Sequence, residues 1–274
     1  MSDIGPVVSA DLHAHGLCVE EMPFPQETLR DEVGYRRELR KVLDDITPKF
    51  VMPVGCQIAA ARCRDILPEV TILTADSAHK LEMLESKVSA SAIAARLGIA
   101  QPKVYGSVDE VESWPVIFKK DGSFGGRGVR KPSDRTALER ILAHEAGRSK
   151  GYLIEEYVPG CDLSIDIVRA GRTDINWSCY RSLGCNGLGP SMGRQILSNE
   201  DLHCTEMARC ATAILESIDY RGICGMDFRI GDDGRLLFLE CNPRFTGGLA
   251  SQLAAGFDLP VLLLQAFANP PLAQ

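Results

Sequence analysis

One segment near the C-terminus constrains the fold of this chain more than any other. The segment consists of two strand-like runs, Gly225–Arg229 and Leu239–Gly248, with a turn signal at Gly231–Gly234 between them. Two glycines and two aspartates between such runs predict a β-hairpin. A four-residue loop, Asp232–Arg235, would place Asp227 directly opposite Glu240. Alternate residues of a strand share a face, so Glu240 and Asn242 are expected to project together.

The predicted hairpin brings two carboxylates and one amide oxygen to one face. Oxygen ligands of this kind suit Mg²⁺, which commonly coordinates substrate phosphates as well. The alternative is an ordinary exposed hairpin whose acidic side chains are solvated. The segment by itself favours neither interpretation, and the rest of the chain has to decide between them.

Charge and composition exclude several classes of protein. The 274 residues carry a net charge of -7, and the basic residues are scattered, which argues against a nucleic-acid-binding protein. No apolar run reaches membrane-spanning length, and the N-terminus has no signal-peptide pattern. The ten cysteines include no Cys-x-x-Cys pair, so we expect buried, reduced thiols and a cytoplasmic location.

Strand and helix patterns predict two regions. Residues 1–83 alternate short strands with helices, which predicts a parallel βα arrangement. A helix is expected from Ser77 to Leu97, where Gly98 stops it. Further strands are expected near residues 116–118, 152–155 and 163–168, and helices near 133–144, 200–217 and 260–268. Residues 174–198 show little periodicity.

A glycine-rich loop follows a strand that ends in lysine. After Val116-Ile117-Phe118, the chain reads Lys119-Lys120-Asp121-Gly122-Ser123-Phe124-Gly125-Gly126-Arg127-Gly128. Glycines let a backbone approach phosphate oxygens closely, and lysine supplies a positive charge. The alternative is a flexible surface hairpin with a solvated lysine. The loop is neither a Walker loop nor a Rossmann turn.

A third motif is an apolar strand that ends in acidic residues. It runs from Tyr152 through Glu155 and Glu156 to Val158, and Asp162 follows after a Pro-Gly turn. Such an edge offers backbone groups to an adenine and a carboxylate to ribose hydroxyls. A strand that ends in a solvated turn explains the pattern equally well.

The order and spacing of these three motifs resemble the ATP-grasp superfamily, in the branch of carbamoyl-phosphate-synthetase-like and biotin-carboxylase-like nucleotide sites. The resemblance covers about residues 77–270, and the Glu-x-Asn-Pro-Arg motif at Glu240–Arg244 is its most specific part. It implies an α/β fold in which two α+β subdomains clasp ATP. Residues 84–274 would form this domain, with a nucleotide-clasping part at 105–160 and a metal-binding, catalytic part at 161–274. Residues 1–83 would form a short, incomplete Rossmann-like domain.

The resemblance assigns roles to individual residues. Lys87 and Lys119 correspond to the two lysines that reach the nucleotide phosphates, and Lys119 and Arg244 serve the chemistry. Asp227, Glu240 and Asn242 correspond to the metal ligands. The remaining nucleotide-binding positions are Ser123, Gly125, Gly126, Gly128, Glu155, Glu156, Val158 and Asp162. The family usually has Glu where this chain has Asp162, so the reach to the ribose is one methylene shorter.

The implied activity is ATP-dependent carboxylate–amine ligation through an acyl phosphate, which gives an amide, ADP and phosphate. ATP and one or two Mg²⁺ ions, which Mn²⁺ can replace, are the implied cofactors. The implied substrates are small carboxylates and amines, such as amino acids or biosynthetic intermediates. The implied assembly is a homodimer, and no nucleic-acid or membrane partner is expected. Two alternatives remain: a bicarbonate- or carbamate-phosphorylating enzyme, and an ATP-binding module that completes a partner.

Three polar residues before the hairpin are candidates for the substrate side. Arg181, Ser191 and Arg194 lie in a glycine-rich stretch, and arginine favours bidentate contact with a carboxylate. A solvated loop is the equally good alternative. The pair His13 and His15 resembles the metal motif of some hydrolases but lacks further ligands downstream, so a loop is the simpler interpretation.

Overall fold

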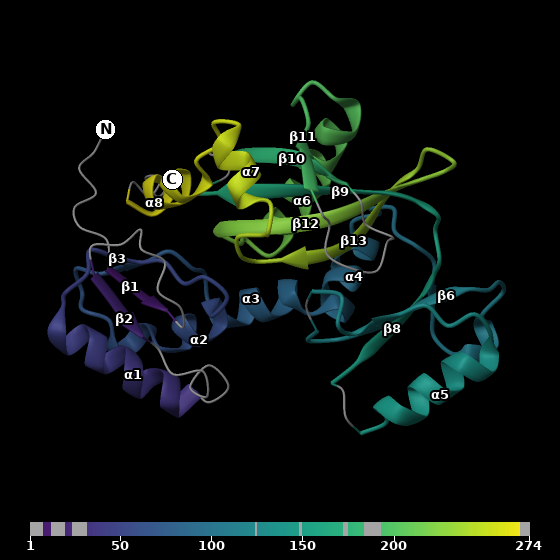
Figure 1. The fold of residues 1–274 in the computed structure, drawn as a ribbon, viewed down its shortest axis with the longest axis horizontal. Helices are drawn as coiled ribbons and strands as arrows, with labels where there is room; N and C mark the ends of the chain where they lie inside the picture. Colours follow the sequence, from purple (N-terminus) through teal and green to yellow (C-terminus); the bar gives the residue numbers. More distant parts are fainter. Residues whose placement is uncertain are drawn as a thin grey trace. The chain divides into compact units, whose positions relative to one another are not determined.

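The computed structural model describes residues 8–11, 20–23, 32–123, 125–147, 150–171, 175–183 and 193–268. The chain divides into two compact units, Met1–Ala78 and His79–Gln274 (Figure 1). His13, His15 and Ser191 lie outside the described residues. Within the described part, no helix has the length and apolar character needed to cross a bilayer.

The first unit contains short parallel strand pairs with helices between them. Strand β1 pairs with β2 and β3 pairs with β4, both in parallel. The elements are β1 (Val8–Asp11), β2 (Glu20–Pro23), α1 (Glu32–Asp45), β3 (Phe50–Val51), α2 (Gln57–Arg62), a 3-10 turn (Arg64–Ile66) and β4 (Ile72–Leu73). The βα alternation expected from the sequence is present, but each described sheet has two strands.

The second unit begins with two helices rather than the single helix expected from Ser77 to Leu97. These are α3 (Ala78–Glu85) and α4 (Lys87–Arg96). The break occurs because Ser86 caps α4: its Oγ accepts a hydrogen bond from the N–H of Ser89 at 3.1 Å. The cap makes Lys87 the first residue of α4.

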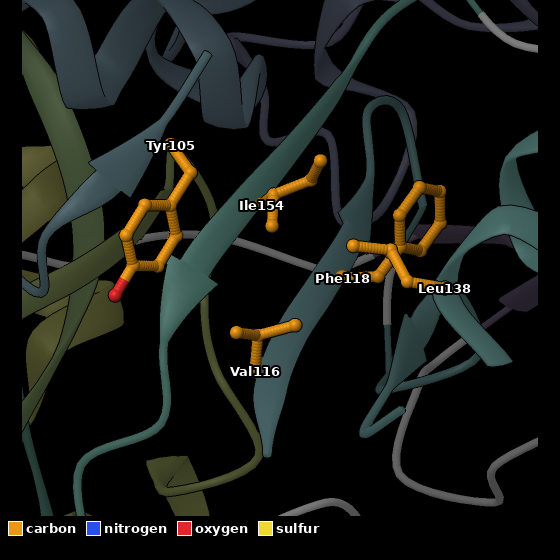
Figure 2. Packing of buried hydrophobic residues seen from close by; sticks show 5 residues of the cluster. All are labelled: Tyr105, Val116, Phe118, Leu138 and Ile154. Carbon is orange, nitrogen blue, oxygen red and sulfur yellow. The ribbon is translucent and has the colours of Figure 1, made fainter. Parts of the chain in front are cut away.

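A four-stranded antiparallel sheet follows, in the order β5-β8-β6-β7. Its strands are β5 (Val104–Tyr105), β6 (Val116–Lys120), β7 (Val129–Arg130) and β8 (Tyr152–Glu156), and the 3-10 turn Val108–Glu110 follows β5. Helix α5 (Arg135–Glu145) lies beside this sheet (Figure 1). Figure 2 shows Leu138 of α5 beside Phe118 of the sheet, in a cluster that also contains Val116, Ile154 and Tyr105, all nearly inaccessible to solvent.

The larger sheet has five antiparallel strands in the order β11-β10-β9-β12-β13. These are β9 (Gly160–Arg169), β10 (Ile175–Leu183), β11 (Gly193–Ile196), β12 (Gly222–Gly231) and β13 (Leu236–Asn242), and the helices are α6 (Leu202–Ser217), α7 (Leu249–Ala254) and α8 (Leu259–Ala268). Helices α6 and α8 pack against β9. Strands β10 and β11 occupy the stretch in which the sequence showed little periodicity.

Candidate active site

The polar residues of the larger sheet form two neighbouring rows across its strands. The register pairs Tyr180 with Ser164, Ser164 with Asp227, and Asp227 with Glu240. The adjacent row, two residues further along each strand, consists of Ser178, Asp166, Gly225 and Asn242. Residues two apart share a face, so both rows lie on the same face. The intervening row is apolar or thiol-bearing: Cys179, Ile165, Met226 and Cys241, all buried.

The hairpin pairs Asp227 with Glu240 as predicted, but by a different route. The tip has three residues, Asp232–Gly234, because the N–H of Gly231 donates to the carbonyl of Arg235 at 2.9 Å. The shorter loop shifts the register by one residue, so that Phe228 faces Phe238. A β-bulge between these pairs takes up Leu239 and restores the pairing of Asp227 with Glu240. The expected four-residue loop is therefore wrong, although the expected partners are correct.

The two paired carboxylates have opposite pKa shifts. Burial, and then the negative charge of Glu240, raise the pKa of Asp227 to about 7. Burial also acts to raise the pKa of Glu240, but the positive charges of Lys87 and Lys119 outweigh it and lower the pKa. Ser164 donates to Asp227 Oδ1 at 2.6 Å and fixes its orientation.

Asn242 and Arg244 extend the hairpin pair. Asn242 Nδ2 donates to Asp227 Oδ2 at 3.2 Å, and Arg244 Nη2 donates to Asn242 Oδ1 at 2.9 Å. The hydrogen bonds join Arg244, through the amide, to the carboxylate pair. Four residues of the Glu-x-Asn-Pro-Arg region and its partner strand therefore form one connected group: Asp227, Glu240, Asn242 and Arg244.

Lys87 joins three segments that are distant in sequence. From the first turn of α4, its Nζ donates to the carbonyl of Ser123 at 2.6 Å and lies 3.2 Å from Glu240 Oε2. The Lys87 side chain is 7% exposed and the Glu240 side chain 26%, so the lysine is shielded from solvent while its partner is half-buried. Asp121 accepts hydrogen bonds from the N–H of Lys87 and the hydroxyl of Ser86, which holds the start of the helix against the glycine-rich loop.

Lys119 approaches the same group from the smaller sheet. Its Nζ lies 2.7 Å from Glu155 Oε2 and donates to the carbonyl of Leu239 at 3.2 Å. Leu239 is the bulged residue of the hairpin, so the irregularity that restores the carboxylate register also presents a carbonyl to the lysine. Lys119 and Glu155 are both buried.

The glycine-rich loop has the backbone that its composition predicts. Gly125 and Gly126 have φ angles of 62° and 73°, which favour glycine. The hydroxyl of Ser123 donates to the carbonyl of Lys120 at 2.6 Å, and a Cβ on Gly128 would overlap Ser123. Phe124, within this loop, lies outside the described residues.

The acidic residues at and after the end of β8 contact different partners. Glu155 contacts Lys119, whereas Glu156 Oε2 accepts from the backbone N–H of Lys103 at 3.3 Å, so these neighbouring side chains have different partners. The carbonyl of Val158 accepts from Arg229 Nη1 at 3.0 Å. Arg229 also holds the Asp162 carboxylate, at 2.6 and 2.7 Å, as its partner across the strand pair. The nucleotide roles of these residues remain predictions.

A second polar cluster was missed as a site by the sequence reasoning. Asp166, 1% exposed, accepts from Thr246 Oγ1 at 2.6 Å, and the Tyr180 hydroxyl lies 2.9 Å from the same Thr246 oxygen. Burial raises the pKa of Asp166 to about 6. A Cβ on Gly225 would lie 2.6 Å from Asp166 Oδ1, so glycine makes room for this contact. The alternation Leu163-Ser164-Ile165-Asp166-Ile167 is the signal that could have found Ser164 and Asp166.

One of the two arginines suggested for the substrate side lies beside this cluster. The Arg194 guanidinium is 5.5 Å from the centre of the Tyr180 ring, and its Nη2 would be 2.8 Å from a Cβ on Gly247. Arg181 lies next to Tyr180 on β10, opposite Leu163 of β9. A solvated loop is wrong for both arginines, since each belongs to a strand of the larger sheet.

The donor set on the sheet fits a divalent cation. Asp227 and Glu240 are paired, and the raised pKa of Asp227 reflects two carboxylates held together in a shielded position. A divalent cation relieves that repulsion. Asn242 presents its nitrogen to Asp227, so a half-turn of the amide would bring its oxygen to the same place. No described group of three or more His, Cys, Asp or Glu side chains has metal-binding geometry, so the amide would have to complete the set.

Comparisons with known proteins bear on the fold and on the family that the chain resembles. Residues 148–273 match the family described as "ATP-grasp in the biosynthetic pathway with Ter operon". The carbamoyl phosphate synthase large chain of Methanospirillum hungatei is 26% identical over 186 residues, which cover 60% of this chain and 17% of that protein. The arginine-specific large chain of Bacillus subtilis is 25% identical over 134 residues, covering 48% of this chain and 13% of that protein. The chain thus spans a small part of these relatives' length.

Solved structures show the same fold. The biotin carboxylase domain of Hydrogenobacter thermophilus 2-oxoglutarate carboxylase, solved with MgADP and bicarbonate, superposes with a TM-score of 0.74 at 15% identity, over 97% of this chain and 64% of that one. L-amino acid ligase from Bacillus licheniformis superposes with a TM-score of 0.70 at 16% identity, over 96% of this chain and 67% of that one.

The fold expected from the sequence motifs is confirmed by these superpositions, while the Rossmann-like character of residues 1–83 stays a prediction. The two sheets, the glycine-rich loop between β6 and β7, and the Glu-x-Asn-Pro-Arg hairpin point to the same family as the comparisons. Residues 148–273 match an ATP-grasp family model, and the chain as a whole has the fold of the ATP-grasp enzymes to which it is similar.

Proposed function

We propose that the chain catalyses ATP-dependent ligation of a small carboxylate to an amine. The observation that carries the proposal is the pairing of Asp227 with Glu240 within reach of two lysines from other segments, Lys87 and Lys119. Phosphoryl transfer depends mainly on positioning and on neutralising charge, and this group supplies both.

The proposed reaction has two steps. A carboxylate oxygen of the first substrate attacks the terminal phosphorus of ATP, the bond to the bridging oxygen breaks, and ADP leaves. The nitrogen of the amine then attacks the carbonyl carbon of the acyl phosphate and forms the C–N bond. The bond between that carbon and the phosphate oxygen breaks, phosphate leaves with the electron pair, and the nitrogen loses a proton. Mg²⁺, when bound, neutralises phosphate charge during the first step.

The chain's own residues have distinct tasks in this proposal. Asp227 and Glu240 would hold Mg²⁺, with Asn242 as a third ligand. Lys87 and Lys119 would exchange their present partners, Glu240 with the Ser123 carbonyl and Glu155 with the Leu239 carbonyl, for phosphate oxygens. Each lysine would then neutralise a carboxylate when no nucleotide is bound and contact a phosphate when one is bound.

Arg244 would face the substrate carboxylate. It lies two residues after Asn242 and is tied to it, so its guanidinium sits next to the metal group. Thr246, two residues after Arg244, forms hydrogen bonds with Asp166 and Tyr180. This anchoring orders the segment that carries Arg244, which lowers the entropic cost of holding a substrate in position.

The family description and one structural neighbour support the ligase reaction. The matched family is described as part of a biosynthetic pathway, and one structural neighbour is named as an L-amino acid ligase. A second candidate, phosphorylation of bicarbonate, is favoured by the neighbour that was solved with bicarbonate. The third alternative, an ATP-binding module without turnover, would use the paired carboxylates only to bind MgATP.

One assay separates the three. Purified chain with MgATP is screened for ADP release against pools of amino acids, pools of other small carboxylates with amines, and bicarbonate alone. ADP release that requires both a carboxylate and an amine, with an amide detected by mass spectrometry, supports the ligase. Release with bicarbonate alone supports the second candidate. ATP binding without release under any condition would overturn both enzymatic proposals.

A further inference from the structure

A cavity of about 320 Å³ lies in the smaller sheet region, between that sheet and α5. It is lined by Phe118, Lys120, Arg127, Gly128, Arg130, Arg140, Ile141, His144 and Glu145. We call it the basic cavity. Its size is within the range of small-molecule sites, which is roughly 300–1,000 Å³. None of the residues assigned to the metal group or its lysines lines it.

The basic cavity and Lys119 lie on opposite faces of the smaller sheet. Residues alternate between faces along a strand, so Phe118 and Lys120 project away from Lys119. Phe118 packs with Leu138 of α5 (Figure 2), which identifies the α5 face. Arg130 pairs with Phe118 across β6 and β7 and therefore belongs to the same face. The cavity is thus separated from Lys119 by the thickness of the sheet.

Positive charge predominates in the basic cavity. Its lining contains four cationic side chains, Lys120, Arg127, Arg130 and Arg140, against the single carboxylate of Glu145. That carboxylate is already 2.6 Å from Lys120 Nζ. Neither Arg127, Arg130 nor Arg140 forms an ion pair with a carboxylate in the part of the chain that the structure describes.

Such a concentration of charge is unusual for this chain, whose net charge is -7. Like charges that converge on one hollow repel one another, and an anion placed among them removes the repulsion. Arg140 and His144 are one helical turn apart on α5, so they present their side chains to the same place. Arginine forms forked hydrogen bonds with both phosphate and carboxylate groups.

One wall of the basic cavity is the end of the glycine-rich loop. Arg130 Nη1 donates to the carbonyls of Arg127 and Val129, at 2.9 Å each. The N–H of Lys120 donates to the carbonyl of Gly128 at 2.9 Å, and the N–H of Val129 to that of Gly126 at 3.1 Å. An anion held between Arg127 on the loop and Arg140 on α5 would therefore tie the loop to the helix.

We propose that the basic cavity binds a compact polyanion, a small molecule with several phosphate or carboxylate groups, and that occupancy restrains the glycine-rich loop from the face opposite the nucleotide lysine. The proposal does not depend on the ligase activity. It rests on the cavity, its lining and its shared wall with the loop.

The binding test uses calorimetry in metal-free buffer with two probes, pyrophosphate for the phosphate source and citrate for the carboxylate source. Arg140→Gln removes a cavity charge from an exposed position of α5, and Arg96→Gln removes an exposed charge from α4 as the matched control. We expect Arg140→Gln to weaken binding of at least one probe about tenfold or more. Arg96→Gln should bind as the wild type does.

A third variant, Lys87→Met, identifies binding at the nucleotide side. Pyrophosphate binding that falls in Lys87→Met and is unchanged in Arg140→Gln would overturn the proposal, as would the absence of binding by both probes at millimolar concentration. Binding that is lost only in Arg140→Gln supports it, whichever of the two probes shows it.

The loop restraint has a separate readout. Trypsin cleaves after Arg127, and a probe that ties the loop to α5 should slow cleavage at that bond in the wild type and in Arg96→Gln. The same probe should give no protection in Arg140→Gln. Equal cleavage rates with and without a bound probe would overturn the coupling to the loop.

Discussion

Asp227 lies directly across from Glu240 on neighbouring strands, and the two carboxyl groups have pKa values shifted in opposite directions. Glu240 is close to two lysines and stays ionised, whereas Asp227, half-buried beside it with a pKa raised to about 7, is only partly ionised near neutral pH. Neighbouring carboxyls whose environments separate their pKa values commonly have different roles. Here the pair is suited to bind one further cation, either a proton or a divalent metal ion.

Replacing Glu240 with Gln should abolish turnover while leaving the fold intact. The side chain keeps its shape but loses the charge that faces Lys87 and the proposed cation. We expect kcat for ADP release to fall by a factor of about 100 or more. Asp233→Asn, an exposed acid at the tip of the same hairpin, is the control and should retain activity. Unchanged activity in Glu240→Gln would contradict the metal assignment.

Mg²⁺ binding should weaken as the pH falls. A cation binds the ionised form of Asp227, and the pKa of that group is raised to about 7 by burial and by Glu240. At pH 6 most molecules hold the proton, so affinity should be about tenfold lower than at pH 8. Calorimetry in buffers of different ionisation enthalpy would measure the released proton. Asp227→Asn should bind weakly at both pH values; equal wild-type affinity at both would contradict the prediction.

Asp166→Asn should stabilise the protein at high pH and not at low pH. Because the folded-state pKa is raised to about 6 by burial, the unfolded chain loses this proton first as pH rises from about 4. The wild type should therefore lose up to about 3 kcal/mol between pH 4 and pH 8, which the variant keeps. Urea unfolding at both pH values measures this difference. Asp232→Asn, exposed at the hairpin tip, serves as control, and a pH-independent difference would refute the explanation.

Gly225→Ala should impair activity through the segment that carries Arg244. An added Cβ would overlap Thr246 Cγ2 and lie 2.6 Å from Asp166 Oδ1, so the segment after Asn242 must move. We expect destabilisation of about 1–3 kcal/mol, typical of overpacking, and a loss of kcat. In Gly193→Ala the nearest atom, Leu183 Cβ, is 3.9 Å away, so stability and kcat should stay close to wild type. Equal behaviour of the two variants would remove the steric argument.

The sequence predicted most of the group around the hairpin because local rules determine it. A turn signal and strand alternation were enough to pair Asp227 with Glu240. The loop length was wrong because a three-residue tip with a bulge at Leu239 and a four-residue tip without one lead to the same partners. Short-range patterns do not distinguish them.

Long-range pairing accounts for what the sequence did not predict. Strand β10 alternates apolar and polar residues only from Ile175 to Cys179, before Arg181 breaks the pattern, and its place in the sheet depends on β9. The role of Asp166 depends on Thr246, 80 residues away, and on the absence of a side chain at Gly225. Such contacts exist only once the sheet has formed.

The partners of Lys87 and Lys119 have a consequence for how tightly a ligand can bind. Both ammonium groups are already immobilised by contacts within the chain, so a ligand that takes over those contacts does not have to freeze two flexible side chains. Ordering a long side chain costs about 0.5–1.5 kcal/mol on association. Folding has already ordered both side chains. An incoming anion therefore only has to bind the two lysines more strongly than Glu240, Glu155 and two backbone carbonyls do. The two lysines are therefore preorganised for an anion that brings its own compensating cation.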